Sequence, residues 1–405
     1  MTTTAPPTVS TTRRWSMLGL GVFAQTAGGV FANAPAFLIP TLHDRAGLTL
    51  AQAGVIAAMP TVGYLVSLIA WGAVVDRIGE RRVLGIGLGA AAVASAAAAA
   101  TCDISLVLLG AFLFVGGTAA SSANAASGRV VVGWFPAHQR GLAMGIRQMA
   151  LPLGVAVAAL TVPRIAADHG IAWAMALPAA FCALAAVCCL TLVIDPPRPS
   201  RADAADQGLL DNPYVGRSVL WRIHAVSVLL VVPQYLVWTF ALVWLITDRH
   251  WSATSAGVLV TVAQLLGAVG RIGAGAWSDR VGSRMRPLRQ VALAAAVAMA
   301  ALAVTDWLDS PISVAVLLVA SVITVADNGL AFTAVAEISG PYWSGRALGA
   351  QNTSQYLAAS VVPPLFGAVI GVFGFPAAFA LSALCPVVAA PLVPQDPTDP
   401  TNPMQ

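Results

Sequence analysis

The segment GAVVDRIGERR at residues 72–82 returns as GAWSDRVGSR at residues 275–284. The aspartates of the two copies, Asp76 and Asp279, are 203 positions apart, and the glycines and the first arginine around them keep the same spacing. Each copy joins two long apolar stretches. A repeat of this period in so apolar a chain predicts two homologous membrane halves, an arrangement that is typical of secondary transporters.

The composition places the chain in a bilayer. Apolar residues make up 58% of the chain and charged residues only 9%, whereas roughly 25% of residues are charged in soluble proteins. Twelve apolar runs come near the ~20 residues that a membrane helix needs: 15–40, 50–74, 83–101, 105–134, 142–165, 171–194, 221–246, 252–276, 290–305, 312–338, 347–370 and 375–394. Because each half has an even number of helices, both halves begin on the same side of the membrane. The two repeated loops therefore face the same compartment.

We therefore predict an all-α membrane protein with twelve transmembrane helices in two pseudo-symmetric halves of six helices each. The halves cover residues 1–194 and 221–394. Residues 195–220 are polar and contain prolines, which predicts a cytoplasmic linker between the halves. Residues 395–405 are polar and proline-rich, which predicts a disordered tail.

All 21 basic residues are arginines. Fifteen of them fall on the side of the repeated loops and three, Arg45, Arg164 and Arg249, on the other side. By the positive-inside rule this predicts a multi-pass protein of the cell's inner membrane with both termini cytoplasmic. The net charge of +4 is then a signal of topology and gives no reason to expect nucleic acid as a partner. Arg13 and Arg14 before the first apolar run imitate a signal peptide, but we expect that run to be retained, because its loss would break the match between the halves.

Two six-helix halves with G-x-x-x-D-R-x-G-x-R between the second and third helices, and again between the eighth and ninth, resemble the major facilitator superfamily over nearly the whole chain. The segment WFPAHQRGLAMGIRQ (134–148) is similar to anion-handling branches of that superfamily, such as the cyanate, oxalate/formate and anion:cation symporter groups. The resemblance implies that charged residues of the repeated loops form an inner gate: Asp76, Arg77, Arg81, Asp279, Arg280 and Arg284. We expect each aspartate of the gate to face the positive N-terminus of a helix of the opposite half. The alternative interpretation is ordinary topogenic charge.

Three arginines lie within apolar runs, where a charge costs at least ~2.5–3.5 kcal/mol and normally faces a wet cavity or a partner. Arg147 follows Arg140 by two helical turns, which places it roughly 10 Å into the membrane at ~1.5 Å per residue. It is our first choice for binding substrate. Arg129 lies nearer the membrane interface. We leave two interpretations open for it, a residue of the substrate cavity and a residue of the gate. For Arg271, just before Gly275, we favour a structural role.

Asp327 is the most deeply placed acid, in the predicted helix 312–338. It is our candidate for proton coupling, although a fixed ion pair with an embedded arginine stays equally open. Gln351 occupies the position of Arg147 in the second half. Together with Arg147 and Arg129, six uncharged polar residues form the predicted substrate site: Gln25, Asn33, Gln234, Tyr235, Gln351 and Asn352.

These residues predict a secondary active transporter that moves a small anion, with a carboxylate favoured, by rocker-switch alternating access. A planar guanidinium suits a carboxylate because its fork binds both oxygens. The alternative is a proton-coupled exporter of drugs or other amphipathic compounds, which is less favoured because the first predicted helix has no acid. A third interpretation is a sensor or scaffold that transports nothing.

We expect neither an enzyme nor a cofactor or metal, because the sequence shows no nucleophile–base pair and no metal-ligand spacing. The expected partners are the small anion, an ion that is co-transported or exchanged, and membrane lipid. We expect the protein to be a monomer. Symport and antiport both stay open.

Overall fold

The computed structural model describes residues 10–44 and 47–396. In these residues the chain forms helices joined by turns and no β-strand. Eleven of the helical segments found there are long and apolar enough to cross a membrane. The last of them, Ser344–Leu392, is non-helical at Gly374, whose φ of 80° lies in the left-handed region that glycine adopts without strain. This segment therefore supplies two spans, and the predicted all-α architecture of twelve spans is confirmed.

The contacts divide the chain into two compact units. Unit 1 contains residues 1–136 and 150–199, and unit 2 contains residues 137–149 and 200–405. The segment 137–149 thus packs with the helices of the second half, although it begins the fifth span of the first half. The expectations for Arg45 and for most of the tail lie outside the described residues.

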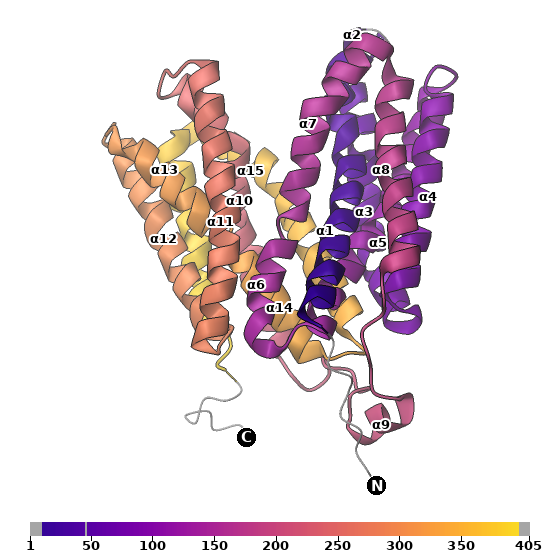
Figure 1. Cartoon of the computed structure of the whole chain (residues 1–405). Helices are drawn as coiled ribbons and strands as arrows, with labels where there is room; N and C mark the ends of the chain where they lie inside the picture. The colour runs from indigo at the N-terminus through magenta and orange to yellow at the C-terminus, as the bar shows by residue number, and fades with distance from the viewer. Residues whose placement is uncertain (1–9, 45–46, 397–405) are drawn as a thin grey trace. The chain divides into compact units, whose positions relative to one another are not determined.

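Unit 1 is a bundle of six long helices with two short helical elements after the first. Leu109 and Leu113 are among its fully buried side chains. Helix α3 (Leu50–Ile78) begins with a capping box, in which the side chains of Thr49 and Gln52 each accept a hydrogen bond from the backbone N–H group of the other residue. The elements are α1 (Thr11–Asn33), η1 (Ala34–Leu38), α2 (Ile39–Asp44), α3 (Leu50–Ile78), α4 (Glu80–Thr101), α5 (Leu106–Trp134), α7 (Ala150–His169) and α8 (Ile171–Leu192) (Figure 1).

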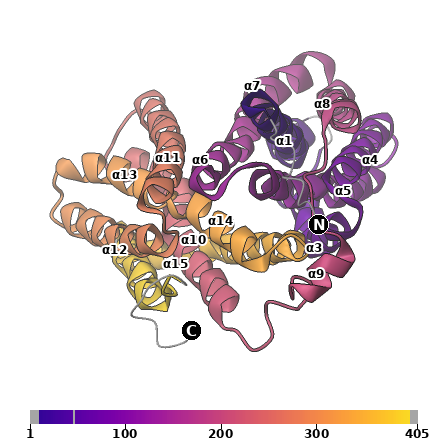
Figure 2. The ribbon, with the colours of Figure 1, turned by 60° about the horizontal axis from the view of Figure 1, so that its bottom comes forward.

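Unit 2 has its own core, in which the rings of Trp244 and Phe379 meet edge to face at 6.1 Å. Helix α6 lies along α11 and α14 in both ribbon views (Figure 2). Gly141 and Gly275 make this close approach possible, because a Cβ atom at either position would collide with the backbone of the other. The elements of unit 2 are α6 (Ala137–Arg147), α9 (Arg201–Asp206), α10 (Val219–Thr247), α11 (Ala253–Val281), α12 (Met285–Trp307), α13 (Ile312–Ile323), α14 (Asp327–Ser339) and α15 (Ser344–Leu392).

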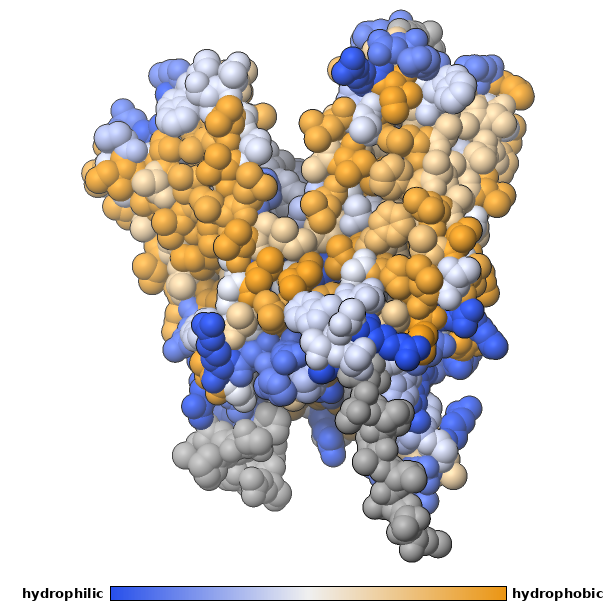
Figure 3. All heavy atoms as spheres, viewed as in Figure 1, coloured by the Kyte–Doolittle hydropathy of each residue, from blue (hydrophilic) through white to orange (hydrophobic). Residues whose placement is uncertain are grey.

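Apolar side chains cover the outer flanks of the helices in each unit. Val93, Leu160 and Val297, for example, expose most of their surface although they lie in the middle of long helices. Figure 3 shows hydrophobic residues along the sides of the helices and hydrophilic residues at their ends. This pattern is what lipid contact requires of a membrane protein.

Two of the predicted spans are broken, which corrects the expectation of continuous helices at 142–165 and 312–338. The first break separates α6 from α7 at residues 148–149, and the second separates α13 from α14 at residues 324–326. Pro152 explains the first break, because it has no N–H group to donate to the carbonyl four residues earlier. Broken spans are common where transporters bind their substrates.

Candidate functional site

A buried charge cluster closes one end of unit 1. Arg129 of α5 contacts Asp76 at 3.1 Å and Glu80 at 3.2 Å, and Glu80 also contacts Arg198 at 3.1 Å. The side chains of Arg129, Asp76 and Glu80 are at most 3% exposed. Arg129 therefore lies with the first repeated loop, among the residues predicted for the gate. This arrangement favours the gate over the cavity for Arg129.

Glu80 was not predicted as a site residue, although it belongs to the first copy of the repeated loop. We expect Glu80→Gln to lower the free energy of unfolding by about 3 kcal/mol, because it removes the carboxylate that Arg129 and Arg198 share and leaves Arg129 with the carboxylate of Asp76. Thermal unfolding of the purified protein measures the loss. Asp168→Asn is the matched control, since Asp168 faces Arg164 on the exposed surface. Equal melting temperatures of Glu80→Gln and the control would contradict this expectation.

The corresponding end of unit 2 holds a second charge cluster around Asp279. Its carboxylate accepts hydrogen bonds from the backbone N–H groups of Gly141 at 2.9 Å and Leu142 at 2.8 Å. Asp279 also contacts Arg284 at 2.7 Å. The contact expected between Asp279 and the helix that begins the fifth span is therefore present. The contact expected of Asp76 with a helix of the other half stays a prediction.

Glu337 completes the cluster of unit 2. It contacts Arg284 at 3.2 Å and Arg140 at 3.4 Å. Burial alone lowers the pKa of Arg284, but the hydrogen bonds and charges of Glu337 and Asp279 outweigh burial and raise that pKa above its ordinary value. Arg284 therefore stays charged while it joins α6, α11 and α14 at this end of the unit.

The two clusters differ in the charge that the fourth span supplies. In unit 1 the fourth span supplies the cation, Arg129, and the acids Asp76 and Glu80 belong to the repeated loop. In unit 2 the fourth span supplies the acid, Glu337, and the repeated loop supplies Arg284. The sequence repeat alone could not reveal this difference, because neither Arg129 nor Glu337 has a charged counterpart in the other half.

The remaining gate candidates lie at the surface. Arg77 and Arg280 are exposed. Arg81 donates from its guanidinium to the carbonyl of Leu190 at 2.7 Å, and its backbone N–H donates to Asp195 at 2.7 Å. These contacts tie the start of α4 to the last turn of α8 and to the segment that follows it.

Arg147 is the last residue of α6 and is only 1% exposed. Its guanidinium donates to the side-chain oxygen of Gln148 at 2.8 Å and lies 5.7 Å from the centre of the Phe332 ring. A cation above an aromatic face gains electrostatic attraction in a dry setting. The first helix break thus holds a positive charge inside a membrane span.

Arg271 lies at the same break. Because Pro152 cannot donate to the carbonyl of Gln148, that oxygen is available, and the guanidinium of Arg271 donates to it at 3.4 Å. The structural role expected for Arg271 stays a prediction. Arg271 also interacts electrostatically with Asp327 and lies near Tyr235.

Asp327 is the first residue of α14 and is only 1% exposed. No side chain of the described residues donates a hydrogen bond to either of its carboxylate oxygens. Its charge interacts with that of Arg271. Each helix break therefore carries a buried charge, and Arg271 lies within reach of both breaks.

Two tyrosines complete this group, which we call the central cluster: Arg147, Arg271, Asp327, Tyr235 and Tyr356. Tyr356 lies near Arg147 and Tyr235. Tyr356 was not predicted as a site residue. All five residues belong to unit 2, and α6, α10, α11, α14 and α15 each supply one of them.

Amide pairs connect the first and fourth spans of each half. In unit 1, Gln25 donates to Asn124 at 3.3 Å and accepts from Ser127 at 3.0 Å. In unit 2, Asn328 donates to Gln234 at 3.0 Å. Asn124 and Asn328 are counterparts in the repeat, so the same kind of pair recurs in both halves. Gln234 therefore lies next to the central cluster, whereas Gln25 lies inside unit 1.

Gln351 is held at both ends of its amide. Its oxygen accepts from Nδ1 of His224, and its nitrogen donates to the hydroxyl of Ser227. On the other side of the imidazole, the hydroxyl of Tyr214 lies 2.9 Å from Nε2. Burial raises the pKa of Tyr214 to about 12, so this phenol stays protonated and can donate. Gln351 thus links α15 to α10 and, through His224, to the linker.

The other two polar candidates bond within their own helices. Asn33 donates to the carbonyl of Gly29 at 2.7 Å, and Asn352 donates to that of Leu348 at 2.8 Å. Across residues 10–44 and 47–396, no three metal-binding side chains lie close enough together to hold a metal ion.

Helical units with charges buried in their spans and ion-pair clusters at their ends define a multi-pass membrane transporter. The chain belongs to the Major Facilitator Superfamily, whose family model matches residues 18–363.

Known proteins similar to the chain fit this class. An MFS-type transporter of Mycobacterium tuberculosis is 50% identical over 381 residues, which are 94% of this chain and 85% of the relative. A protein of Oryza sativa subsp. japonica, named "Probable anion transporter 3, chloroplastic", is 31% identical over 156 residues, or 38% of this chain and 30% of the relative. The solved structure of the proton:xylose symporter XylE shares the fold with a TM-score of 0.74, at 16% identity over 94% of this chain and 95% of that one.

Proposed function

We propose that the protein is a secondary active transporter that carries a small organic anion, a carboxylate, across the inner membrane by alternating access. The observation that carries the proposal is the burial of Arg147 at a helix break within a membrane span. A charge at such depth costs at least ~2.5–3.5 kcal/mol, so its retention indicates a function. A guanidinium binds a carboxylate through two parallel charge-assisted hydrogen bonds.

The composition of the central cluster supports an anion. Two guanidinium groups and two phenols stand against one carboxylate, so donors outnumber acceptors. The partial likeness to the chloroplastic anion transporter supports the same class of substrate. In this proposal Arg147 is the primary anchor of the substrate, and Arg271 supplies the second positive charge.

Asp327 is the group that we propose to couple transport to protons. While it is ionised, its charge attracts Arg271. A proton taken up by Asp327 removes that attraction and leaves Arg271 for the substrate, so proton and anion bind together. This gives proton symport. A fixed ion pair between Asp327 and Arg271 is the competing interpretation, and it predicts transport that does not respond to a proton gradient.

We propose that the two end clusters form the cytoplasmic gate of a rocker-switch cycle. The arginine-rich loops of these ends support the cytoplasmic assignment. Asp279 would act as a latch, since one carboxylate joins α11 to two backbone N–H groups of α6. Opening this side separates the two helices and breaks both hydrogen bonds.

A binding screen tests the proposed substrate class. Purified protein is heated with small carboxylates, with inorganic anions or with lipophilic cations, and the melting temperature is compared with that of the protein alone. A ligand at 100 times its Kd stabilises the folded state by about 2.7 kcal/mol. We expect carboxylates to raise the melting temperature. A response to lipophilic cations alone would favour the drug-exporter alternative and overturn the proposal.

We expect Asp279→Asn to loosen the latch. The variant keeps the shape of the side chain but loses the charge that strengthens the bonds to Gly141 and Leu142, and a hydrogen bond to a charged group contributes roughly 1.5–3 kcal/mol. Hydrogen–deuterium exchange of a peptide covering residues 137–149 should become about tenfold faster. Asp211→Asn, in the exposed linker, is the control. Exchange as slow as in the wild type would rule out the latch.

A further inference from the structure

We propose that the transported anion is amphipathic, with a carboxylate head bound by Arg147 and Arg271 and an apolar tail in a pocket between α10, α11 and α13. This inference rests on the proposed function of the central cluster and adds the substrate class. Three observations carry it: the pocket, its continuity with the cluster, and the state of the polar atoms in its walls.

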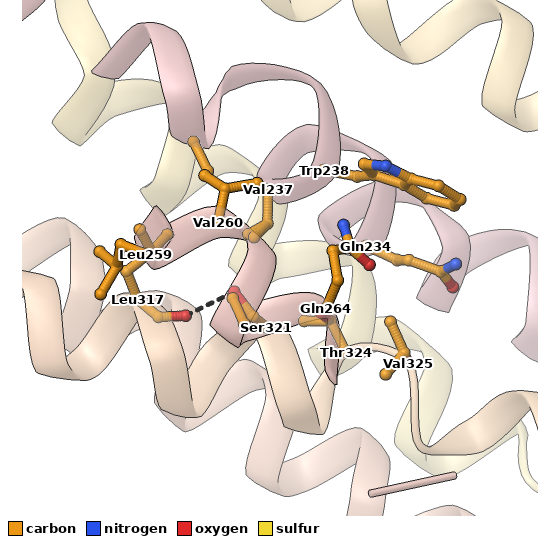
Figure 4. A pocket seen from close by; sticks show the side chains of 12 residues that line it. Gln234, Val237, Trp238, Leu259, Val260, Gln264, Leu317, Ser321, Thr324 and Val325 are labelled. Carbon is orange, nitrogen blue, oxygen red and sulfur yellow. Dashed lines mark hydrogen bonds between the residues drawn. The ribbon is translucent and has the colours of Figure 1, made fainter. Parts of the chain in front are cut away.

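The pocket lies inside unit 2 and has a volume of about 30 Å³. This is room for two or three groups the size of a water molecule, at ~10–15 Å³ each, and so for the end of a short alkyl chain. Figure 4 shows Leu259 and Leu317 at one end of the pocket and Trp238 at the other, near the amides of Gln234 and Gln264.

The pocket adjoins the central cluster on three elements. On α10, the ring of Trp238 in the pocket contacts the ring of Tyr235 in the cluster, with centroids 5.4 Å apart. On α11, Gln264 precedes Arg271 by two turns, or roughly 10 Å along one face of the helix. Val325 lies in the turn that leads directly into Asp327. The walls of the pocket and the residues of the central cluster are therefore neighbours along these elements.

Most of the lining is apolar, and three of its polar side chains already make hydrogen bonds. The hydroxyl of Ser321 donates to the carbonyl of Leu317 at 2.7 Å, and that of Thr324 donates to Ala320 at 2.8 Å. The side-chain oxygen of Gln234 accepts from Asn328. An alkyl or aryl tail that enters here leaves these three hydrogen bonds intact and buries apolar surface against the other side chains of the lining.

A series of straight-chain carboxylates from acetate to hexanoate tests the inference. Isothermal titration calorimetry with the protein in lipid nanodiscs measures each Kd, and empty nanodiscs correct for partitioning into lipid. We expect the affinity to rise about fourfold for each methylene that enters the pocket, the equivalent of ~0.8 kcal/mol.

Two variants locate the effect. Ala241→Leu fills the pocket from α10, and we expect it to abolish the gain in affinity from acetate to hexanoate. Ala225→Leu, an exposed position on the same helix, is the matched control and should keep the full gain. Ala263→Val is a smaller filling change from α11, should Ala241→Leu fail to fold.

The possible results separate this inference from the proposed function. If no carboxylate of the series binds the wild type, the proposed function fails, and the inference fails with it. If acetate binds but longer chains bind no more tightly, the inference alone is overturned. It is also overturned if the pocket-filling variants keep the same chain-length dependence as Ala225→Leu.

Discussion

Replacing Arg147 with Ala is expected to abolish transport of the anion while the protein still folds. The substrate would lose two charge-assisted hydrogen bonds, each of which contributes roughly 1.5–3 kcal/mol. Since about 1.4 kcal/mol corresponds to a tenfold change, the affinity should fall by about 100-fold or more. Folding should survive, because the change removes a buried charge and its desolvation cost instead of leaving one uncompensated.

Uptake of a labelled carboxylate into proteoliposomes measures this effect. Arg164→Ala is the matched control, because Arg164 lies in the second helix of the same span but its side chain is 87% exposed. Arg147→Lys keeps the charge and removes the planar fork, so we expect it to transport weakly. Transport by Arg147→Ala at the wild-type rate and affinity would eliminate Arg147 as the anchor of the substrate.

Much of the fold could be predicted because the signals were strong and repeated. Each span has enough consecutive apolar residues to be recognised alone, and the duplicated loop establishes two halves. Asp279 was expected to face the N-terminus of the fifth span, and it bonds to that span at Gly141 and Leu142, the fifth and sixth residues of α6. These inferences needed only local chemistry and spacing.

The helix breaks could not be predicted, and they decide the candidate site. Pro152 lies in the first turn of α7, a position where proline is also compatible with an uninterrupted apolar run. The consequence, a carbonyl of Gln148 that Arg271 reaches from another helix, depends on tertiary packing. The second break, before Asp327, has no proline or glycine within residues 324–326, and the structure offers no local reason for it.

The contacts that each polar side chain makes could not be predicted from the sequence either. Arg129 could have faced a cavity or a gate, and only its distances to Asp76 and Glu80 favour the gate. Gln351 was expected to contact substrate as the counterpart of Arg147, yet both ends of its amide are engaged by His224 and Ser227. Pseudo-symmetry in the sequence therefore predicted where polar residues lie but not what each one binds.

The Asp327→Asn variant is expected to keep exchange of the anion across the membrane and to lose its accumulation against a gradient. Asparagine cannot take up a proton, but it preserves the size and hydrogen-bonding capacity of the side chain, so the substrate can still bind and cross. One pH unit supplies about 1.4 kcal/mol, which drives up to tenfold accumulation by a symporter that moves one proton per cycle. This gain should vanish in the variant.

Two proteoliposome assays distinguish the interpretations of Asp327. The first measures exchange of labelled against unlabelled substrate without a gradient, and the second measures uptake driven by an inward proton gradient. Asp309→Asn, whose side chain is 91% exposed, is the control and should behave as the wild type in both. If Asp327 forms a fixed ion pair with Arg271, the variant should lose exchange and gradient-driven uptake together, because Arg271 then lacks its buried partner. Normal accumulation with an unchanged pH profile would show that protons are coupled elsewhere in the protein.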